Sequence, residues 1–180
     1  MAEYYEMQIA GLTRKLRKCP VSEKLDIAAF IMLGDVEITV ASAKALLERV
    51  PDFDIILTAE CKGIPLAYEM ARQSGKPYVV ARKTVKLYMQ DVISVEVKSI
   101  TTAQTQVLHL DGETAALMKD KRVLIVDDVI STGESLNALE ALAKKAEANI
   151  VGEACVLAEG SASKRDDLIF LEPLPLFFKD

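Results

Sequence analysis

The stretch VLIVDDVISTGES, residues 123–135, decides the fold. Its first four residues, 123–126, are all apolar, which predicts a strand buried on both faces in the middle of a parallel sheet. After the turn that follows, apolar residues recur at helical spacing and predict a helix: Leu136, Leu139, Ala143 and Ala146. A buried strand that leads through a short turn into a helix is the repeating unit of parallel α/β sheets.

The same alternation continues on both sides of this stretch. DIILT (54–58) and PYVVA (77–81) are predicted strands with a helix at 63–73 between them, and IVGEACVLA (150–158) supplies a further strand. Crossovers between such strands are right-handed, and ligands bind at the carboxyl ends of the strands. The sequence therefore predicts an α/β fold with a twisted, mainly parallel sheet that is flanked by helices.

The first 50 residues follow a different pattern. LDIAAFIML (25–33) is strand-like, and Asp35 is a suitable cap for a helix that follows it. This helix is expected to carry five apolar residues on one face: Val36, Val40, Ala43, Leu47 and Val50. No internal repeat or Gly/Ser linker marks a boundary, so residues 1–180 are expected to form one domain with this segment as a small appendage.

Composition limits the function classes. Hydrophobic residues make up 51% of the 180 residues, too many for a disordered chain, and no apolar run approaches the roughly 20 residues of a membrane span. The N-terminus lacks the apolar core of a signal peptide, and Cys19, Cys61 and Cys155 form neither a disulfide framework nor a CxxC metal site. A net charge of −5 argues against general nucleic-acid binding. We expect a cytoplasmic protein that binds neither nucleic acid nor membranes.

The turn after the buried strand has the chemistry of a phosphate site. Its backbone N–H groups and the N-terminus of the next helix converge on one point with partial positive charge. Ser131, Thr132 and Ser135 can add hydroxyl donors, and Gly133 lets the backbone approach a ligand closely.

Asp127 and Asp128, which end the strand, need a different ligand, because carboxylates repel phosphate. Two adjacent acids suit the hydroxyls of a ribose diol, or a Mg²⁺ ion that bridges to the diol. Phosphate donors beside diol acceptors describe a site for ribose 5-phosphate. The alternative is a strand that ends in exposed acids before an ordinary capped helix.

The whole run resembles the diphosphoribose-binding motif of type I phosphoribosyltransferases, and the likeness to their adenine and xanthine members extends over nearly the whole chain. It implies the type I fold, with a small N-terminal hood and a flexible β-hairpin loop. The hood would comprise about residues 1–50 plus the C-terminal tail, and the core about 51–170. It also implies phosphoribosyl diphosphate and a purine base as substrates, and a homodimer.

The resemblance assigns roles within the run. Asp127 and Asp128 would be catalytic and would hold Mg²⁺, and residues 131–135 would bind phosphoribosyl diphosphate. Two positions depart from the family. Glu134 stands where glycine is usual, and Ser135 stands where threonine is common.

TAECKGIP (58–65) resembles the pyrophosphate loop of the family, in which an acid, a small residue, a basic residue and a glycine recur. Glu60, Cys61, Lys62 and Gly63 match these positions in turn, which implies that they bind the diphosphate. Lys62 would supply a flexible point charge. In the family this loop often holds a cis peptide. The alternative is a plain helix entry with a solvated lysine.

ARKTVKLYMQDVISVEVKSITT (81–102) begins with three cations, Arg82, Lys83 and Lys86, and then lacks a clear periodicity. Such a segment is a candidate lid that excludes water from a reaction, and residues 84–94 are expected to be poorly ordered without ligand. RKTVKL resembles the family's RKxxKL, whose cations reach the pyrophosphate, in part across a dimer interface.

Glu96 matches a glutamate that adenine members carry after the mobile loop, which implies a catalytic role in managing the purine proton. The alternative is a solvent-facing strand position between Val95 and Val97. His109, the sole histidine, is expected on a strand surface.

The segment 25–33 resembles the hood of xanthine members, which binds the purine. Leu25 and Phe30 match its apolar positions. Met32 falls where xanthine members place an asparagine, and Glu159 falls near their lysine beside the base, so donors for the carbonyl oxygens of xanthine are missing. A carboxylate can accept from an exocyclic amine, which favours adenine.

Two alternatives stay open. One is a phosphoribosyltransferase for xanthine, or for hypoxanthine and guanine. The other is a regulator that senses phosphoribosyl diphosphate without catalysis. Regulators of this fold append a DNA-binding domain, for which the first 50 residues are too short and not basic enough.

Overall fold

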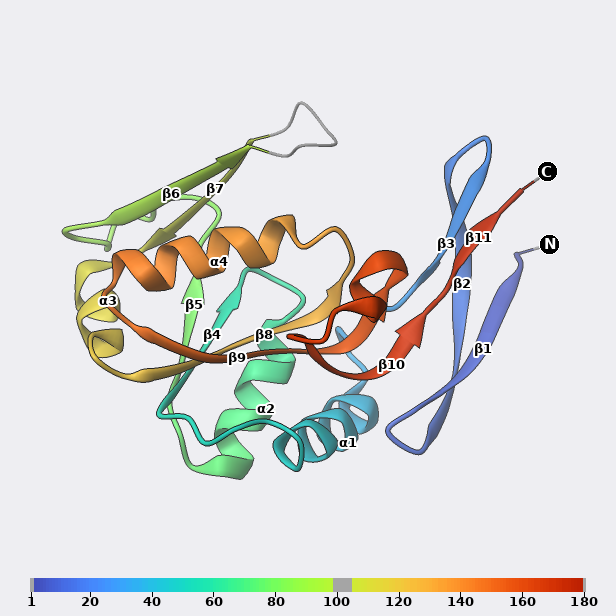
Figure 1. The fold of residues 1–180 in the computed structure, drawn as a ribbon, viewed down its shortest axis with the longest axis horizontal. Helices are drawn as coiled ribbons and strands as arrows, with labels where there is room; N and C mark the ends of the chain where they lie inside the picture. Colours follow the sequence, from blue (N-terminus) through green and yellow to red (C-terminus); the bar gives the residue numbers. More distant parts are fainter. Residues whose placement is uncertain (1, 99–104, 180) are drawn as a thin grey trace.

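The computed structural model describes residues 2–98 and 105–179. A parallel sheet with helices on both faces forms the body of the molecule, and a small antiparallel sheet stands at one end beside both chain termini (Figure 1). A two-stranded hairpin lies at the other end of the body. The predicted α/β fold with a mainly parallel sheet flanked by helices is confirmed.

The body sheet has the strand order β10-β9-β8-β4-β5, and each neighbouring pair is parallel. β8 (Arg122–Ile130) is its middle strand, and the predicted strand core, residues 123–126, is fully buried. The remaining strands are β4 (Ile55–Ala59), β5 (Tyr78–Ala81), β9 (Asn149–Glu159) and β10 (Ile169–Leu174). A short 3₁₀ turn, η1 (Gly160–Lys164), follows β9.

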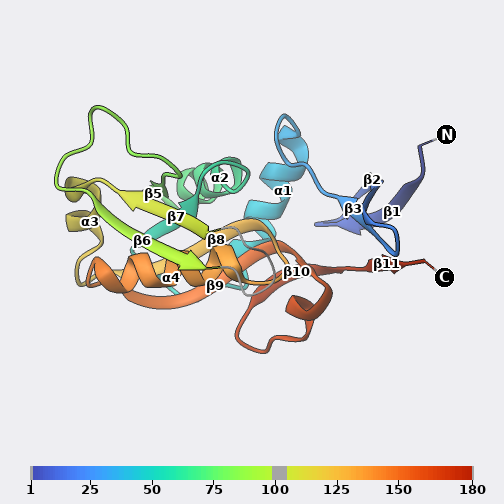
Figure 2. The ribbon, with the colours of Figure 1, turned by 90° about the horizontal axis from the view of Figure 1, so that it is seen from above.

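Helices cover both faces of the body sheet (Figure 2). α1 (Val36–Leu47) and α2 (Ile64–Ser74) pack on one face and enclose one hydrophobic core. α3 (Gly112–Met118) and α4 (Glu134–Lys145) cover the other face and enclose a second core. Because successive strand side chains point to opposite faces, β8 contributes to both cores.

The small sheet at the end, here called the hood, has the order β1-β2-β3-β11, and its neighbouring strands are antiparallel. Its strands are β1 (Tyr4–Ile9), β2 (Leu12–Ser22), β3 (Leu25–Ala29) and β11 (Leu176–Phe178). Only β3 was predicted from the sequence. β1 and β2 alternate charged and apolar residues over a mostly exposed surface, so their periodic signal is weak.

α1 begins as predicted, because Asp35 caps it by accepting a hydrogen bond from Ile38 N. The predicted apolar face is wrong in part. Val36 is 74% exposed and Val40 40% exposed, whereas the buried face consists of Ile38, Thr39, Ser42, Ala43 and Leu46. Small and polar residues can face a neighbouring helix closely, and the Thr39 hydroxyl is satisfied by a hydrogen bond to Asp35 O.

The segment between β5 and α3 contains the β-hairpin that the family resemblance implies, preceded by residues 84–92 without a helix or strand. β6 (Ile93–Lys98) and β7 (Thr105–Leu110) form an antiparallel hairpin, and His109 lies on β7 with its Nδ1 2.7 Å from the Ser94 hydroxyl. The last part of the predicted lid segment, residues 99–102, lies outside the described residues. In the parts of the chain that are described, no helix is long and apolar enough to cross a membrane.

Candidate functional site

The loops that follow β4, β5, β8 and β9 meet at one edge of the body sheet, where their carboxyl ends lie. A cavity of about 180 Å³ opens there and is lined by residues from the predicted pyrophosphate loop, Lys83 and the two acids Asp127 and Asp128. The structure therefore brings together three segments that are far apart in the sequence. This is the edge at which parallel α/β sheets bind ligands.

The two acids differ in environment. Asp128 is 2% exposed, and its Oδ2 lies 2.9 Å from Nζ of Lys62. Asp127 Oδ1 accepts a hydrogen bond from the backbone N of Asp128 at 2.9 Å. Burial, together with the nearby Asp128 charge, raises the pKa of Asp127 to about 7. A cationic or hydroxyl-bearing ligand at this point would relieve the repulsion between the two carboxylates.

Gly63 fixes the distance between the pyrophosphate loop and Asp127. A Cβ at this position would overlap the Thr58 hydroxyl and would lie 2.9 Å from Asp127 Oδ1. The backbone of Gly63 has an ordinary helical conformation, so close packing is the reason that glycine is needed here. The peptide bond between Glu60 and Cys61 is cis.

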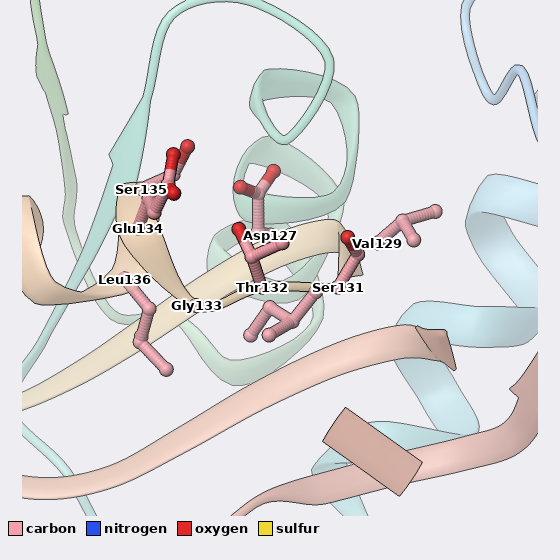
Figure 3. A pocket seen from close by; sticks show the side chains of 9 residues that line it. Asp127, Val129, Ser131, Thr132, Gly133, Glu134, Ser135 and Leu136 are labelled. Atoms are coloured by element: carbon pink, nitrogen blue, oxygen red, sulfur yellow. The ribbon is translucent and has the colours of Figure 1, made fainter. Parts of the chain in front are cut away.

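The phosphate-type turn, residues 131–135, joins β8 to the N-terminus of α4. Gly133 has φ +80°, a left-handed conformation that favours glycine. A cavity of about 130 Å³ is lined by this turn together with Asp127. Figure 3 shows the Asp127 carboxylate beside the turn, with Ser131 and Thr132 next to it and Glu134 and Ser135 on the helix side.

Glu60 contacts the start of the segment that follows β5. Its Oε2 accepts a hydrogen bond from Lys83 N at 3.0 Å, and its Oε1 lies 3.3 Å from Nη2 of Arg82. The Lys83 hydrogen bond is the main cause that lowers the pKa of Glu60, so the carboxylate stays ionised. Lys86 lies further along the loop and donates to the Thr84 hydroxyl at 2.7 Å. Glu60 thus holds the Arg82 guanidinium and the backbone of Lys83, and it also lines the cavity of about 180 Å³.

A third cavity, of about 420 Å³, lies between the hood and the body sheet. It is lined by Ile27, Ala28, Ala29, Phe30, Ile31, Lys62, Val129, Ser131, Glu159 and Leu174. Phe30 and Glu159, two of the predicted base-binding residues, lie here. Burial raises the pKa of Glu159, and a hydrogen bond from the Ser131 hydroxyl works against that increase.

The structure does not bring every predicted residue to this edge. Met32 is fully buried in the core beside α1 and lines a separate groove, because the chain turns away from the hood after Ile31. Leu25 lies at the start of β3 and lines none of the three cavities described above. Glu96 is exposed on β6 and lines none of them either.

Outside the hood segment 25–33, sequence reasoning did not assign Val129 or Leu174 to the wall of the third cavity. Val129 stands between the acids and the turn, so its place in the motif was a usable signal. Leu174 ends β10, and nothing in the local sequence connects it with a site.

A metal could be held only in part by the protein. The paired carboxylates of Asp127 and Asp128 are the hard oxygen ligands that Mg²⁺ prefers. Within residues 2–98 and 105–179, no group of three or more candidate ligands exists, so the ion would complete its shell with water and substrate oxygens, as Mg²⁺ usually does. The donor set fits Mg²⁺ on these terms.

A parallel sheet with a glycine turn at a helix N-terminus, and with cavities at its strand ends, defines an α/β protein that binds ligands at the carboxyl edge. Comparison with known sequences identifies the family within this class. The chain belongs to the phosphoribosyltransferase family, because the sequence model of the phosphoribosyl transferase domain matches residues 37–172.

Individual relatives support this membership. A hypoxanthine/guanine phosphoribosyltransferase of Methanotorris igneus is 33% identical over 162 residues, which cover 85% of this chain and 85% of that protein. A xanthine phosphoribosyltransferase of an Exiguobacterium species is 33% identical over 132 residues, 72% of this chain and 67% of that protein. The fold is similar to the crystal structure of an adenine phosphoribosyltransferase from Thermoanaerobacter pseudethanolicus, with a TM-score of 0.73, 21% identity, and coverage of 88% of this chain and 95% of that one.

Proposed function

We propose that the protein is a purine phosphoribosyltransferase that converts adenine and 5-phosphoribosyl 1-diphosphate to AMP and pyrophosphate. The observation that carries the proposal is the way in which the three cavities share walls. We call the cavity of about 130 Å³ at residues 131–135 the turn cavity, the one of about 180 Å³ at Asp127 and Asp128 the acid cavity, and the one of about 420 Å³ beside the hood the hood cavity. Asp127 and Ser135 line both the turn cavity and the acid cavity. Lys62 lines both the acid cavity and the hood cavity. Two substrates held side by side match this arrangement: a ribose that carries a 5-phosphate and a diphosphate, and a purine base next to its anomeric carbon.

The residues divide the work as follows. The turn 131–135 would hold the 5-phosphate through backbone N–H groups and hydroxyls. Asp127 and Asp128 would fix the ribose hydroxyls, and Lys62 with Lys83 would hold the diphosphate. Mg²⁺ bound at the two acids would neutralise charge on the diphosphate.

As the bond between the ribose carbon and pyrophosphate lengthens, positive charge develops on the sugar. The fixed carboxylates stabilise that charge and the cations stabilise the leaving group, so positioning and electrostatics account for the catalysis. The purine nitrogen attacks the opposite face of the sugar. Residues 84–94 would close over the site and exclude water, and Glu96 would reach the purine proton only if the hairpin moves with them.

Adenine is proposed because of the half-buried Glu159 in the hood cavity. A carboxylate can accept a hydrogen bond from the exocyclic amine of adenine and offers no donor to a carbonyl oxygen. Phe30 supplies an apolar wall in the same cavity.

A 6-oxopurine is the second candidate. The sequence relatives that are named for hypoxanthine, guanine or xanthine favour it, and Lys62, whose Nζ is held by Asp128, also lines the hood cavity and could donate to a carbonyl oxygen. A sensor of phosphoribosyl diphosphate is the remaining alternative, and it would bind the donor without turnover.

Glu159 variants decide between the two bases. Glu159→Gln keeps the shape but can both donate and accept, so kcat/KM for adenine should fall by roughly 5- to 150-fold, corresponding to about 1–3 kcal/mol, while kcat/KM for oxopurines should fall less. Glu159→Lys should disfavour adenine further and admit xanthine or hypoxanthine. An unchanged ranking of adenine, hypoxanthine, guanine and xanthine on both variants would remove Glu159 from base recognition.

A homodimer is also proposed. Val36 and Tyr68 are 74% and 55% exposed and line one apolar groove between α1 and α2, and such a surface suits contact with a second copy. Light scattering should give twice the chain mass, and Val36→Asp should shift the mass toward that of one chain.

A further inference from the structure

Arg165 lies directly behind the phosphate-type turn, although it follows the turn by thirty residues. It comes just after η1, and its guanidinium reaches back toward the start of α4. A methyl group placed on Gly133 would lie 3.4 Å from Nη1 of Arg165. The guanidinium therefore lies beside the one turn residue whose left-handed backbone requires glycine, with about the space of a methyl group between them.

Two carboxylates hold the guanidinium in this place. Its Nε and Nη2 each donate to Asp167 at 2.9 Å, and Nη2 also donates to Glu153 Oε2 at 3.1 Å. Such a fork of parallel hydrogen bonds fixes the plane of the guanidinium and not only its charge. The remaining nitrogen, Nη1, is the one turned toward Gly133.

Glu153, one of the two carboxylates that hold Arg165, is part of the protein interior. The Glu153 side chain is 10% exposed on β9, and it forms a hydrogen bond with Glu140 on α4. Oε2 of Glu140 lies 3.0 Å from Nζ of Lys144 on the same helix. Arg165 thus connects β9 with the segment after η1, and Glu153 extends this connection to the middle of α4.

We propose that Arg165 is a positioning residue for the phosphate-binding turn. Held by Glu153 and Asp167, its guanidinium fills the space beside Gly133 and keeps the turn in the shape that receives a sugar phosphate. This inference rests on the proposed function, because the turn must bind the phosphate of the donor for its shape to matter. Arg165 itself does not need to touch the substrate.

The test measures the dissociation constant of ribose 5-phosphate by calorimetry, together with KM for the diphosphate donor and for adenine. Arg165→Met should raise the dissociation constant and the donor KM about tenfold, equivalent to about 1.4 kcal/mol, and should leave the KM for adenine within about twofold. Arg165→Lys keeps the charge but loses the paired hydrogen bonds of the guanidinium, so the dissociation constant of ribose 5-phosphate should rise at least about fivefold. Asp167→Asn changes a side chain that is 70% exposed, so it weakens the hold on Arg165 without altering the protein interior. This variant should raise the dissociation constant of ribose 5-phosphate about threefold.

Arg122 provides a matched control. It is also held by two carboxylates, Asp52 and Asp54, but at the opposite end of β8. Arg122→Met should lower the melting temperature without changing the affinity for ribose 5-phosphate. Equal losses in this variant would show a general stability effect and would overturn the proposal.

The remaining outcomes are also decisive. Full rescue by Arg165→Lys would make the charge alone sufficient and would overturn the positioning role. Wild-type affinity in Arg165→Met would do the same. If Arg165→Met does not fold, wild-type affinity in Asp167→Asn overturns the proposal. Failure of the wild-type protein itself to bind ribose 5-phosphate would remove the proposed function, and this inference with it, whereas binding that is insensitive to Arg165 removes only the inference.

Discussion

Gly63→Ala tests whether Asp127 is held at the reacting sugar. The new methyl group would overlap the Thr58 hydroxyl and lie 2.9 Å from Asp127 Oδ1, against about 3.4 Å for an ordinary contact, so the carboxylate must move by about 0.5 Å. Overpacking of this kind costs about 1–3 kcal/mol of unfolding free energy, and alanine offsets about 0.4–1 kcal/mol of it because it restricts the unfolded chain. We expect a net loss of about 1–2 kcal/mol.

The effect on activity should be larger than this loss of stability suggests. Catalytic groups tolerate displacements of only about 0.5 Å, and about 1 Å can cost roughly 100-fold, so kcat/KM should fall about tenfold. Steady-state kinetics and denaturant unfolding on the same preparations measure the two effects. Added to Thr58→Ala, the glycine change should cost less stability because the overlapping hydroxyl is gone, yet kcat/KM should still fall.

Gly152→Ala is the matched control, because its methyl group would meet Pro51 and Leu124 at 3.2 and 3.3 Å, at the far end of the sheet. It should lower stability slightly and leave kcat/KM unchanged. If Gly63→Ala keeps wild-type kcat/KM while it loses stability, the placement of Asp127 at the reacting centre is refuted.

Three further predictions follow from the site and its surroundings. Changing both Asp127 and Asp128 to asparagine should reduce kcat/KM by at least about 100-fold with the fold intact by circular dichroism, whereas unchanged kinetics would remove both from the site. Residues 84–92, which precede β6, should exchange their amide hydrogens rapidly without ligand and slowly with ribose 5-phosphate and pyrophosphate, and strong protection in the free protein would contradict a lid. Burial and the Glu140 carboxylate raise the pKa of Glu153 to about 7, so the folded state holds a proton that the unfolded state releases near its ordinary pKa. The unfolding free energy should therefore fall by about 1–2 kcal/mol between about pH 5 and 7, and Glu153→Gln should flatten that part of the curve; identical curves would mean that Glu153 does not titrate in this range.

The body of the fold was predictable because its signals are local. The buried run 123–126 could only suit a central strand, and Pro65 and Gly75 mark the two ends of α2, where Gly75 adopts φ +70°. The phosphate-type turn was equally visible, since a glycine turn at a helix start carries its chemistry in its own sequence.

The remaining features depend on contacts between distant segments. β11 completes the hood by pairing with β3, and no local pattern specifies that partner. Met32 seemed adjacent to the base in sequence, yet the chain turns inward after Ile31 and buries it. Arg165 was not identified at all, because its proximity to Gly133 arises only when the chain after β9 folds back toward the turn before α4.

The conversion of adenine to AMP tests the central claim most directly. Purified protein, phosphoribosyl diphosphate and Mg²⁺ would be incubated with adenine, hypoxanthine, guanine or xanthine, and nucleotide and pyrophosphate would be measured together. We predict equal amounts of AMP and pyrophosphate, dependence on Mg²⁺, and the highest kcat/KM for adenine. A higher kcat/KM for an oxopurine would contradict the base assignment, and binding of the donor without nucleotide formation from any of the four bases would contradict the transferase activity itself.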